Sequence, residues 1–169
     1  VSLELGGNDP MIVCAEVNLK KAVNGAIWAG LSNAGQSCAG VERIYVHRDV
    51  YKPFLKLLKK KVEKLRVGYP DHKNTHIGTM TTSRQHDAVR NVLEEAIAQG
   101  ASVEAISQID ESTGQALPAT ILTDVNQEMR IMKEETFGPV IGVMPFKNIE
   151  EAIQLANNSD LGLTASIWT

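Results

Sequence analysis

The sequence predicts an α/β fold, with a mostly parallel open sheet covered by helices on both faces. Short apolar runs, typical of buried strands, alternate along the chain with longer stretches in which apolar residues recur at helical spacing. This alternation is typical of βαβ units, in which parallel strands are joined by covering helices. The 169 residues, 43% of them apolar, are enough for one domain with a core of its own.

The first half of the chain contributes three expected strands and two expected helices. Apolar and polar residues alternate from the first position, and the next apolar run is continuous, as in a strand buried on both faces. Asn18 can then cap a helix that has small apolar residues along one face. The expected elements are a strand at 1–5, a strand at 10–15, a helix from 18 to about 33, a strand at 43–47 and a helix over 51–65.

The second half begins with a polar loop and then returns to the same alternation. Apolar residues from Val89 to Ile97 keep helical spacing until Gly100, which can end a helix. Turn residues separate the short apolar runs that follow. The expected elements are a loop at 68–82, a helix through 89–97, strands at 101–106 and 119–122, a turn at 129–139, a strand at 140–145, a helix at 150–157 and a strand at 164–168.

Composition and charge argue against several classes of protein. The net charge of −3, with one basic run at 59–61, does not favour a nucleic-acid partner. No apolar run reaches the roughly 18 residues of a membrane span, and no signal peptide opens the chain. Two cysteines and no metal-ligand spacing indicate no metal site and a reducing compartment, the cytoplasm. Because a strand pattern is already under way at Val1, we expect the chain to be part of a longer protein.

Cys38 is the strongest candidate for a catalytic residue. It ends the sequence GQSC (35–38) in a polar loop, where glycine permits close approach and backbone N–H groups can point at a reacting oxygen. Cys14 lies in an apolar run, where cysteine behaves as a small apolar residue, and it is assigned no role. Taken alone, Cys38 could be a nucleophile or a tolerated loop cysteine, since a thiol needs a lowered pKa to react.

Three carboxylates are further candidates. Glu4 sits between two leucines; facing inward it would suit the activation of water, and facing outward it would be an ordinary surface residue. Glu134 and Glu135 precede Thr-Phe-Gly-Pro and could form a solvated turn or a polar clamp beside an aromatic ring. The histidines are expected to face solvent, and none is singled out as a partner for Cys38: His47, His72, His76 and His86.

Three motifs, taken together, resemble the aldehyde dehydrogenase superfamily. LELGG (3–7) is similar to its general-base motif, NAGQSC (33–38) to its nucleophile motif and EETFGPV (134–140) to its cofactor-side motif, in the family's order. The similarity extends over essentially the whole chain, to the closing GLTASIWT. It implies the fold of that family's catalytic domain, and an enzyme that oxidises an aldehyde to a carboxylic acid with NAD or NADP.

The resemblance assigns a role to five residues of the motifs. Cys38 would be the nucleophile that forms a thiohemiacetal and then a thioester, and Glu4 would activate the water that releases the acid. Glu135 would bind the hydroxyls of the nicotinamide ribose, Phe137 would pack near the nicotinamide, and Gly6 would make a backbone contact close to the same ring.

The resemblance also implies what lies outside the chain. The family's dinucleotide-binding domain and its oligomerisation strand match no part of residues 1–169. The chain is therefore expected to be a catalytic domain truncated at both ends, inactive alone, from a homo-oligomeric parent whose aldehyde and choice of NAD or NADP depend on the missing segments. Two other interpretations stay open: a cysteine-dependent hydrolase or acyltransferase that uses one histidine, and a non-catalytic α/β module with an inert Cys38.

Overall fold

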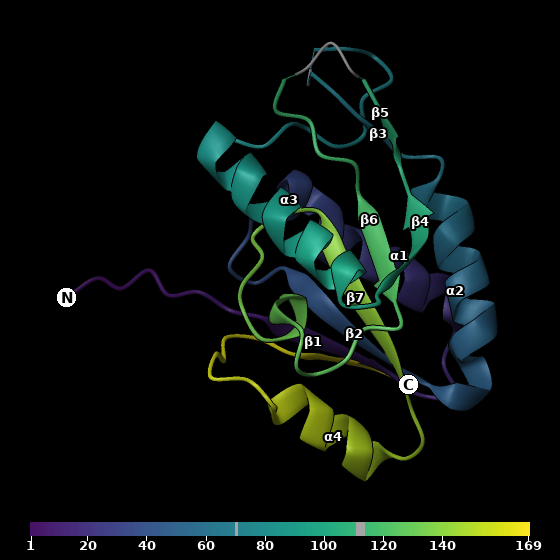
Figure 1. The fold of residues 1–169 in the computed structure, drawn as a ribbon. Coiled ribbons are helices and arrows are strands. Elements are labelled where there is room, and N and C mark those ends of the chain that lie inside the picture. The colour runs from purple at the N-terminus through teal and green to yellow at the C-terminus, as the bar shows by residue number, and fades with distance from the viewer. Residues whose placement is uncertain (70, 111–113) are drawn as a thin grey trace.

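Six strands form one mixed, mostly parallel sheet in the computed structural model, which describes residues 1–69, 71–110 and 114–169 (Figure 1). Neighbouring strands of this sheet run parallel except for the two at one edge, Ser102–Ile106 and Thr120–Thr123, which are antiparallel. The spatial order is β4 (Ser102–Ile106), β6 (Thr120–Thr123), β7 (Val140–Phe146), β2 (Val41–His47), β1 (Asp9–Val13) and β8 (Ser166–Trp168). The predicted fold class is confirmed.

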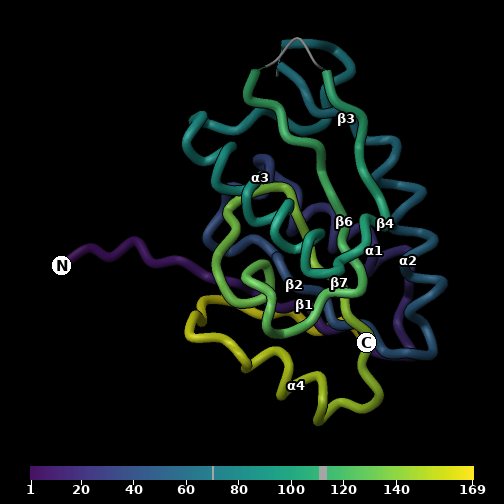
Figure 2. The backbone as a smooth tube through the Cα atoms, in the orientation of Figure 1, coloured from purple at the N-terminus to yellow at the C-terminus, as the bar shows by residue number. Residues whose placement is uncertain are grey.

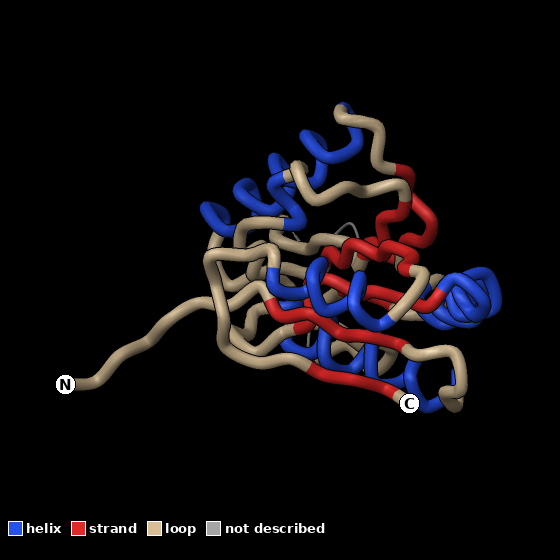
Figure 3. The backbone as a smooth tube through the Cα atoms, turned by 90° about the horizontal axis from the view of Figure 1, so that it is seen from below, coloured by secondary structure: helices blue, strands red, loops and turns tan. Residues whose placement is uncertain are grey.

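Four helices cover the sheet: α1 (Leu19–Leu31), α2 (Arg48–Val62), α3 (Ser83–Ala98) and α4 (Ile149–Asn157). The connection β1-α1-β2 and the connection β7-α4-β8 cross the sheet in opposite directions. Because such crossovers are right-handed, α1 and α4 lie on opposite faces. Figure 3 shows helices on both sides of the strands, as the sequence predicted.

The central strands are buried along their length, which fixes the loops at their ends. All five residues of β1 are buried, as are six of the seven residues of β2. Helix α1 begins at the predicted cap, where the side chain of Asn18 accepts a hydrogen bond from Lys21 N at 3.2 Å. Its buried face consists mainly of small residues, so the helix packs closely on the sheet: Ala22, Val23, Ala26, Gly30 and Leu31.

The predicted opening strand is wrong. Residues 1–5 form an exposed, extended segment that leaves the body of the molecule (Figure 2). Leu3 and Leu5 keep 70% and 64% of their surface exposed, and within the described residues no strand pairs with this segment. Alternation of apolar and polar residues favours a strand only where a neighbouring strand can take up its backbone hydrogen bonds.

Smaller differences concern the ends of elements. Helix α2 ends at Val62, three residues before the expected Leu65, and a short 3₁₀ helix η1 (Ser32–Gly35) follows α1. A separate parallel pair, β3 (Arg66–Val67) and β5 (Gln108–Ile109), was not predicted, because two residues are too few to show a period. Residue 70 of the predicted loop and residues 111–113, between two predicted strands, lie outside the described residues.

Candidate active site

The three motifs meet at the amino ends of three neighbouring strands. Residues 3–7 lead into β1, residues 33–38 lead into β2, and residues 134–140 lead into β7. These strands are adjacent and parallel in the order β7-β2-β1, so their amino ends lie side by side. Segments up to 128 positions apart in the sequence are therefore in contact, as in the hydrogen bond from Gly7 N to Glu135 Oε1.

Two glycines allow the motifs to touch through their backbones. A Cβ atom on Gly7 would lie 2.6 Å from the backbone oxygen of Cys38, closer than carbon and oxygen can approach. A Cβ atom on Gly35 would collide with the carbonyl group of Gly138, and Gly35 has a φ of 70°, a conformation that favours glycine. The first motif is thus packed on the second, and the second on the third.

An open cavity of about 400 Å³ lies where the motifs meet. Every residue to which the resemblance assigned a role borders this cavity. Its lining residues are Glu4, Leu5, Gly6, Gln36, Ser37, Cys38, Glu135 and Phe137.

Cys38 is presented by an irregular turn between α1 and β2. The backbone is left-handed at Asn33, Ala34 and Gly35, with φ values of 53°, 59° and 70°. This turn ends the helical region and leaves Cys38 exposed at the cavity. Within the described parts of the chain, the backbone N–H of Cys38 has no hydrogen-bond acceptor, so it can donate to an oxygen that enters the cavity.

The side chain of Gln36 holds the loop that carries Cys38. Its Oε1 accepts a hydrogen bond from Thr81 N at 2.9 Å, and its Nε2 donates to Asn33 O at 3.0 Å. The amide therefore ties the loop both to itself and to the segment before α3. Such a positioning role for Gln36 was not predicted from the sequence.

Glu4 reaches the cavity from its rim. It lies in the exposed segment before β1, not in the expected strand, and it lines the same cavity as Cys38. Because Glu4 is not part of a strand, it faces neither the inner nor the outer side of the sheet, and neither of the two strand positions considered from the sequence applies.

The two neighbouring carboxylates of the third motif are separated in space. Glu135 lines the cavity, where its Oε1 accepts from Gly7 N at 3.1 Å and Gly6 lies against the same carboxylate. Glu134 pairs with the guanidinium of Arg130 at 2.9 Å, which lowers the pKa of Glu134. Glu134 therefore carries a surface ion pair, and Glu135 alone faces the cavity.

Glu42, a carboxylate buried beside the cavity, was not predicted as a site residue from the sequence. Its oxygens accept hydrogen bonds from Thr136 N, from Phe137 N and from Asn8 Nδ2. Burial raises the pKa of Glu42 to about 7, against the lowering effect of the backbone N–H groups. A signal was available, because a carboxylate inside the buried sequence VERIYV requires hydrogen-bond donors from elsewhere in the chain.

No histidine borders the cavity of Cys38, and all four lie in the described part of the chain. His47 and His86 are half-buried, so the prediction that these two residues face solvent is wrong. Each ring has a partner elsewhere: His47 with Lys147 O, His72 with Asp110, His76 with Arg66 N and His86 with Asp87. A cysteine–histidine pair at Cys38 has no support in this arrangement. Among the described residues, no group of three acidic, histidine or cysteine side chains could hold a metal ion.

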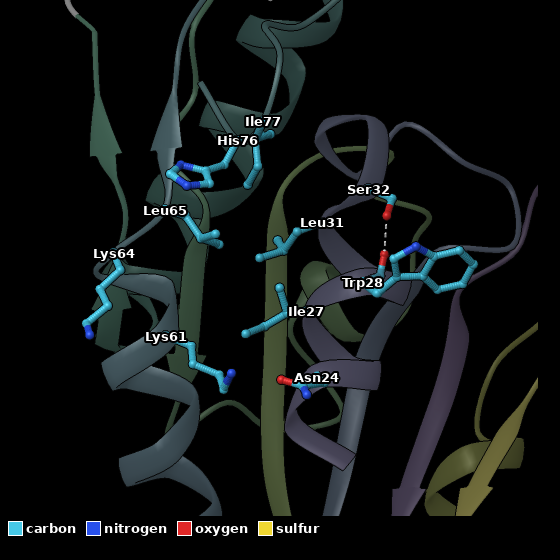
Figure 4. A pocket seen from close by; sticks show the side chains of 10 residues that line it. All are labelled: Asn24, Ile27, Trp28, Leu31, Ser32, Lys61, Lys64, Leu65, His76 and Ile77. Atoms are coloured by element: carbon cyan, nitrogen blue, oxygen red, sulfur yellow. Dashed lines mark hydrogen bonds between the residues drawn. The ribbon is translucent and has the colours of Figure 1, made fainter. Parts of the chain in front are cut away.

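A second cavity lies between α1 and α2, and no residue of the three motifs lines it (Figure 4). Ile27, Leu31 and Leu65 form its apolar wall, and the ammonium group of Lys61 and the ring of His76 lie at its border. Among the described residues, its lining contains no cysteine and no carboxylate, so it offers no alternative site for a reaction that needs a thiol and an acidic side chain together.

Comparison with known proteins identifies one family. The sequence profile of the aldehyde dehydrogenase family matches residues 1–169. A 4,4'-diapolycopene aldehyde oxidase from Methylomonas sp is 46% identical over 169 residues, which are the whole chain and 31% of that protein. An aldehyde dehydrogenase from Paenarthrobacter nicotinovorans is 41% identical over 99% of the chain and 36% of its own length. The chain thus spans about a third of the length of the curated relatives it matches.

Solved structures agree with this result. Lactaldehyde dehydrogenase from Escherichia coli superposes with a TM-score of 0.91 and 38% identity, over 98% of this chain and 35% of that one. Betaine aldehyde dehydrogenase from Staphylococcus aureus, solved in complex with NAD+, gives a TM-score of 0.93 and 31% identity over 98% and 34%. The described helices are all too short or too polar to serve as membrane spans.

Proposed function

Because this chain belongs to the aldehyde dehydrogenase family, we propose that it is the thiol-bearing catalytic domain of an NAD(P)-dependent enzyme that oxidises an aldehyde to a carboxylic acid. The observation that carries this proposal is that Cys38, Glu4, Glu135 and Phe137 border one cavity, although they come from three distant segments. A thiol, a carboxylate that can serve as a base, and a cofactor-side loop are the groups that this oxidation requires.

Cys38 begins the reaction. Its thiolate adds to the aldehyde carbon, the new bond being S–C, while the π electrons of the carbonyl group move to oxygen. The backbone N–H of Cys38, which has no acceptor within the described residues, donates to that oxygen and stabilises its charge. The product of this step is a thiohemiacetal.

The residues at the cavity fit a nicotinamide cofactor. The Glu135 carboxylate is held at the cavity by Gly7 N and can accept hydrogen bonds from ribose hydroxyls, and the half-buried ring of Phe137 offers an apolar surface beside it. When bound, the nicotinamide would supply an acceptor for the hydride that leaves the former aldehyde carbon. Cys38 then carries the acyl group as a thioester.

Glu4 completes the reaction. Its carboxylate takes a proton from a water molecule, whose oxygen attacks the thioester carbon. The C–S bond breaks, the electrons return to sulfur as the thiolate of Cys38, and the carboxylic acid leaves. Glu4 is exposed, so solvent water can reach it, and it lines the same cavity as Cys38.

The remaining parts of the proposal concern the parent protein. Residues 1–169 would work with a dinucleotide-binding domain and an oligomerisation strand supplied by other segments of a homo-oligomer, which would also set the aldehyde and the choice of NAD or NADP. The two free cysteines of the described chain fit a reducing compartment such as the cytoplasm.

The test is a pair of substitutions in the full-length parent enzyme. Cys38→Ala is expected to abolish oxidation of an aldehyde by NAD or NADP, whereas Cys14→Ala, the matched control, is expected to keep it. Glu4→Gln is expected to keep a first burst of reduced cofactor, one per site, and to slow steady turnover by about 100-fold or more. An enzyme that still oxidised aldehydes without Cys38 would refute the proposal.

A further inference from the structure

The turn at Thr136 and Phe137 is held on both sides by two side chains that have no part in the chemistry above. From one side, the Glu42 carboxylate accepts from Thr136 N at 2.9 and 3.0 Å and from Phe137 N at 2.8 Å. From the other side, Gln85 Nε2 donates to Thr136 O at 3.0 Å and to Phe137 O at 3.2 Å. Both peptide N–H groups and both carbonyl groups of the turn are therefore bonded to side chains.

Phe137 needs such support because of its backbone conformation. Its φ is 48°, in the left-handed region that residues with a Cβ atom rarely adopt and that costs about 1 to 2 kcal/mol. A conformation of this kind persists only where the surroundings over-determine it. In this conformation the ring of Phe137 and the carboxylate of Glu135 both border the cavity.

We propose that Glu42 is a positioning residue for cofactor binding: with Gln85 it clamps the Thr136–Phe137 turn in the left-handed conformation that presents Glu135 and Phe137 to the nicotinamide side of the cavity. This proposal rests on the proposed function. Glu42 also accepts a hydrogen bond from Asn8 Nδ2 at 3.0 Å, and the same Nδ2 group donates to Glu134 O at 2.7 Å. The clamp thus connects the third motif to the segment that carries Gly6 and Gly7.

The clamp depends on the charge state of Glu42. In each of its hydrogen bonds the Glu42 carboxylate is the acceptor. The ionised form therefore fits the site, whereas a protonated carboxyl group, which carries a donor of its own, fits it less well. The charged groups on the segments around it are Glu134, which pairs with Arg130, Glu135, which raises the pKa of Glu42, Arg43, which is bonded to Asn8 O, and Asp9, which is bonded to Thr164. Burial, with a smaller effect of the nearby Glu135, raises the pKa of Glu42 to about 7, and the clamp is expected to loosen as the pH falls below that value.

The first experiment measures the turn without the cofactor, in the full-length enzyme. Glu42→Met keeps the length of the side chain and removes both acceptors. Hydrogen exchange of the amides of Thr136 and Phe137 is expected to accelerate by at least about tenfold, because their acceptor is lost. Glu134→Gln also removes one carboxylate charge, close in sequence to the Thr136–Phe137 turn but from a surface ion pair, and it is expected to leave this exchange unchanged.

The second experiment measures the dissociation constant of NAD (or NADP) by titration calorimetry. Glu42→Met is expected to weaken binding by about tenfold, and Gln85→Met, which removes the other half of the clamp from a half-buried site, by a smaller factor. Glu42→Gln keeps one oxygen that can accept from both backbone N–H groups, so it is expected to restore affinity at pH 8. The wild type should bind more tightly as the pH rises from 6 to 8, and Glu42→Gln should lose this dependence.

These outcomes separate the clamp from the proposed function. A wild-type enzyme that binds neither cofactor refutes the proposed function, while the exchange of the turn still reports on the clamp. Unchanged exchange in both Glu42→Met and Gln85→Met overturns the clamp itself. Faster exchange with unchanged cofactor affinity overturns its positioning role. If Glu42→Met fails to fold, Gln85→Met and the pH dependence of Glu42→Gln decide the question.

Discussion

The two ends of the strands β7, β2 and β1 differ in what their loops leave available. At the carboxyl ends, polar groups bond to one another: Cys14 N donates to Trp168 O, and His47 contacts Lys147 O and packs edge-to-face on Phe146. At the amino ends, Cys38 is exposed and its N–H has no acceptor within the described chain. At the carboxyl ends of these three strands, the polar groups thus bond to one another. At the amino ends, a thiol and a backbone N–H are available to bind a reacting group.

The difference runs against the usual arrangement of open α/β sheets, in which ligands bind beyond the carboxyl ends of the strands. Here the loops that precede the strands are the ones that pack on each other, since glycines permit backbone contact between them. Contact between backbones fixes the side chains on these loops more firmly than contact between side chains alone would. The position of the site is therefore set by backbone packing at the amino ends.

Gly35→Ala is expected to break the amino-end arrangement with the largest effect. The added methyl group collides with the Gly138 carbonyl, and it also forces alanine into a φ of 70°. Strain and overpacking together predict a loss of about 4 kcal/mol in the free energy of unfolding of the full-length enzyme. Urea unfolding monitored by circular dichroism measures this loss.

The control for that variant is Gly100→Ala. Gly100 has a φ of 106° but no atom lies within 4 Å of an added Cβ, so only the strain of the backbone remains, at about 1 to 2 kcal/mol. Equal losses in the two variants would show that contact between the loop of Cys38 and the third motif contributes nothing to stability.

The second prediction concerns the cost of keeping Glu42 charged at the amino ends. Burial raises its pKa from 4.5 to about 7, so between these values the folded state binds more protons than the unfolded state. The contribution of Glu42 to stability is therefore present below about pH 4.5 and is lost as the pH rises through 7, by about 3 kcal/mol. At neutral pH and above, the ionised Glu42 carboxylate under the Thr136–Phe137 turn therefore lowers the free energy of unfolding.

The measurement compares two proteins, so that other titrating groups cancel. The free energy of unfolding of the full-length wild type, minus that of Glu42→Gln, is expected to decrease by about 3 kcal/mol from pH 4.5 to pH 8. An increase with pH would mean that hydrogen bonds to the carboxylate outweigh its burial, and that the sign of the pKa shift is reversed.

The sequence predicted the sheet well because the signals of its strands and helices are local. Apolar runs such as PMIVCA and helical spacing such as that after Asn18 depend on residues near in sequence, and the strands and helix appear within a few residues of the expected bounds. The opening strand failed because its pattern needs a neighbour that the described chain does not provide. The motif residues could be assigned only by resemblance, since no spacing within the sequence brings Gly7 beside Glu135.

Glu42 and Gln85 could not be found in this way. Their function in the structure is to bond backbone groups of a turn 94 and 51 positions away, and backbone groups carry no sequence signature. Only the burial of a charged residue in β2 pointed to one of them. Residues that act by positioning a distant backbone are thus the part of a site that sequence patterns predict least.

The smallest effect expected is a difference in reactivity between the two cysteines, which sharpens the comparison of the two ends. Cys38 is exposed, whereas Cys14 is half-buried behind β1 and packs against the apolar core. Access alone predicts that iodoacetamide labels Cys38 about tenfold faster than Cys14 in the full-length enzyme, read by mass spectrometry of the two peptides. Unfolding in urea should remove the difference, because both thiols are then equally accessible. Equal rates in the folded protein would mean that the carboxyl ends open as readily as the amino ends, and that the contrast between them does not explain where the chemistry lies.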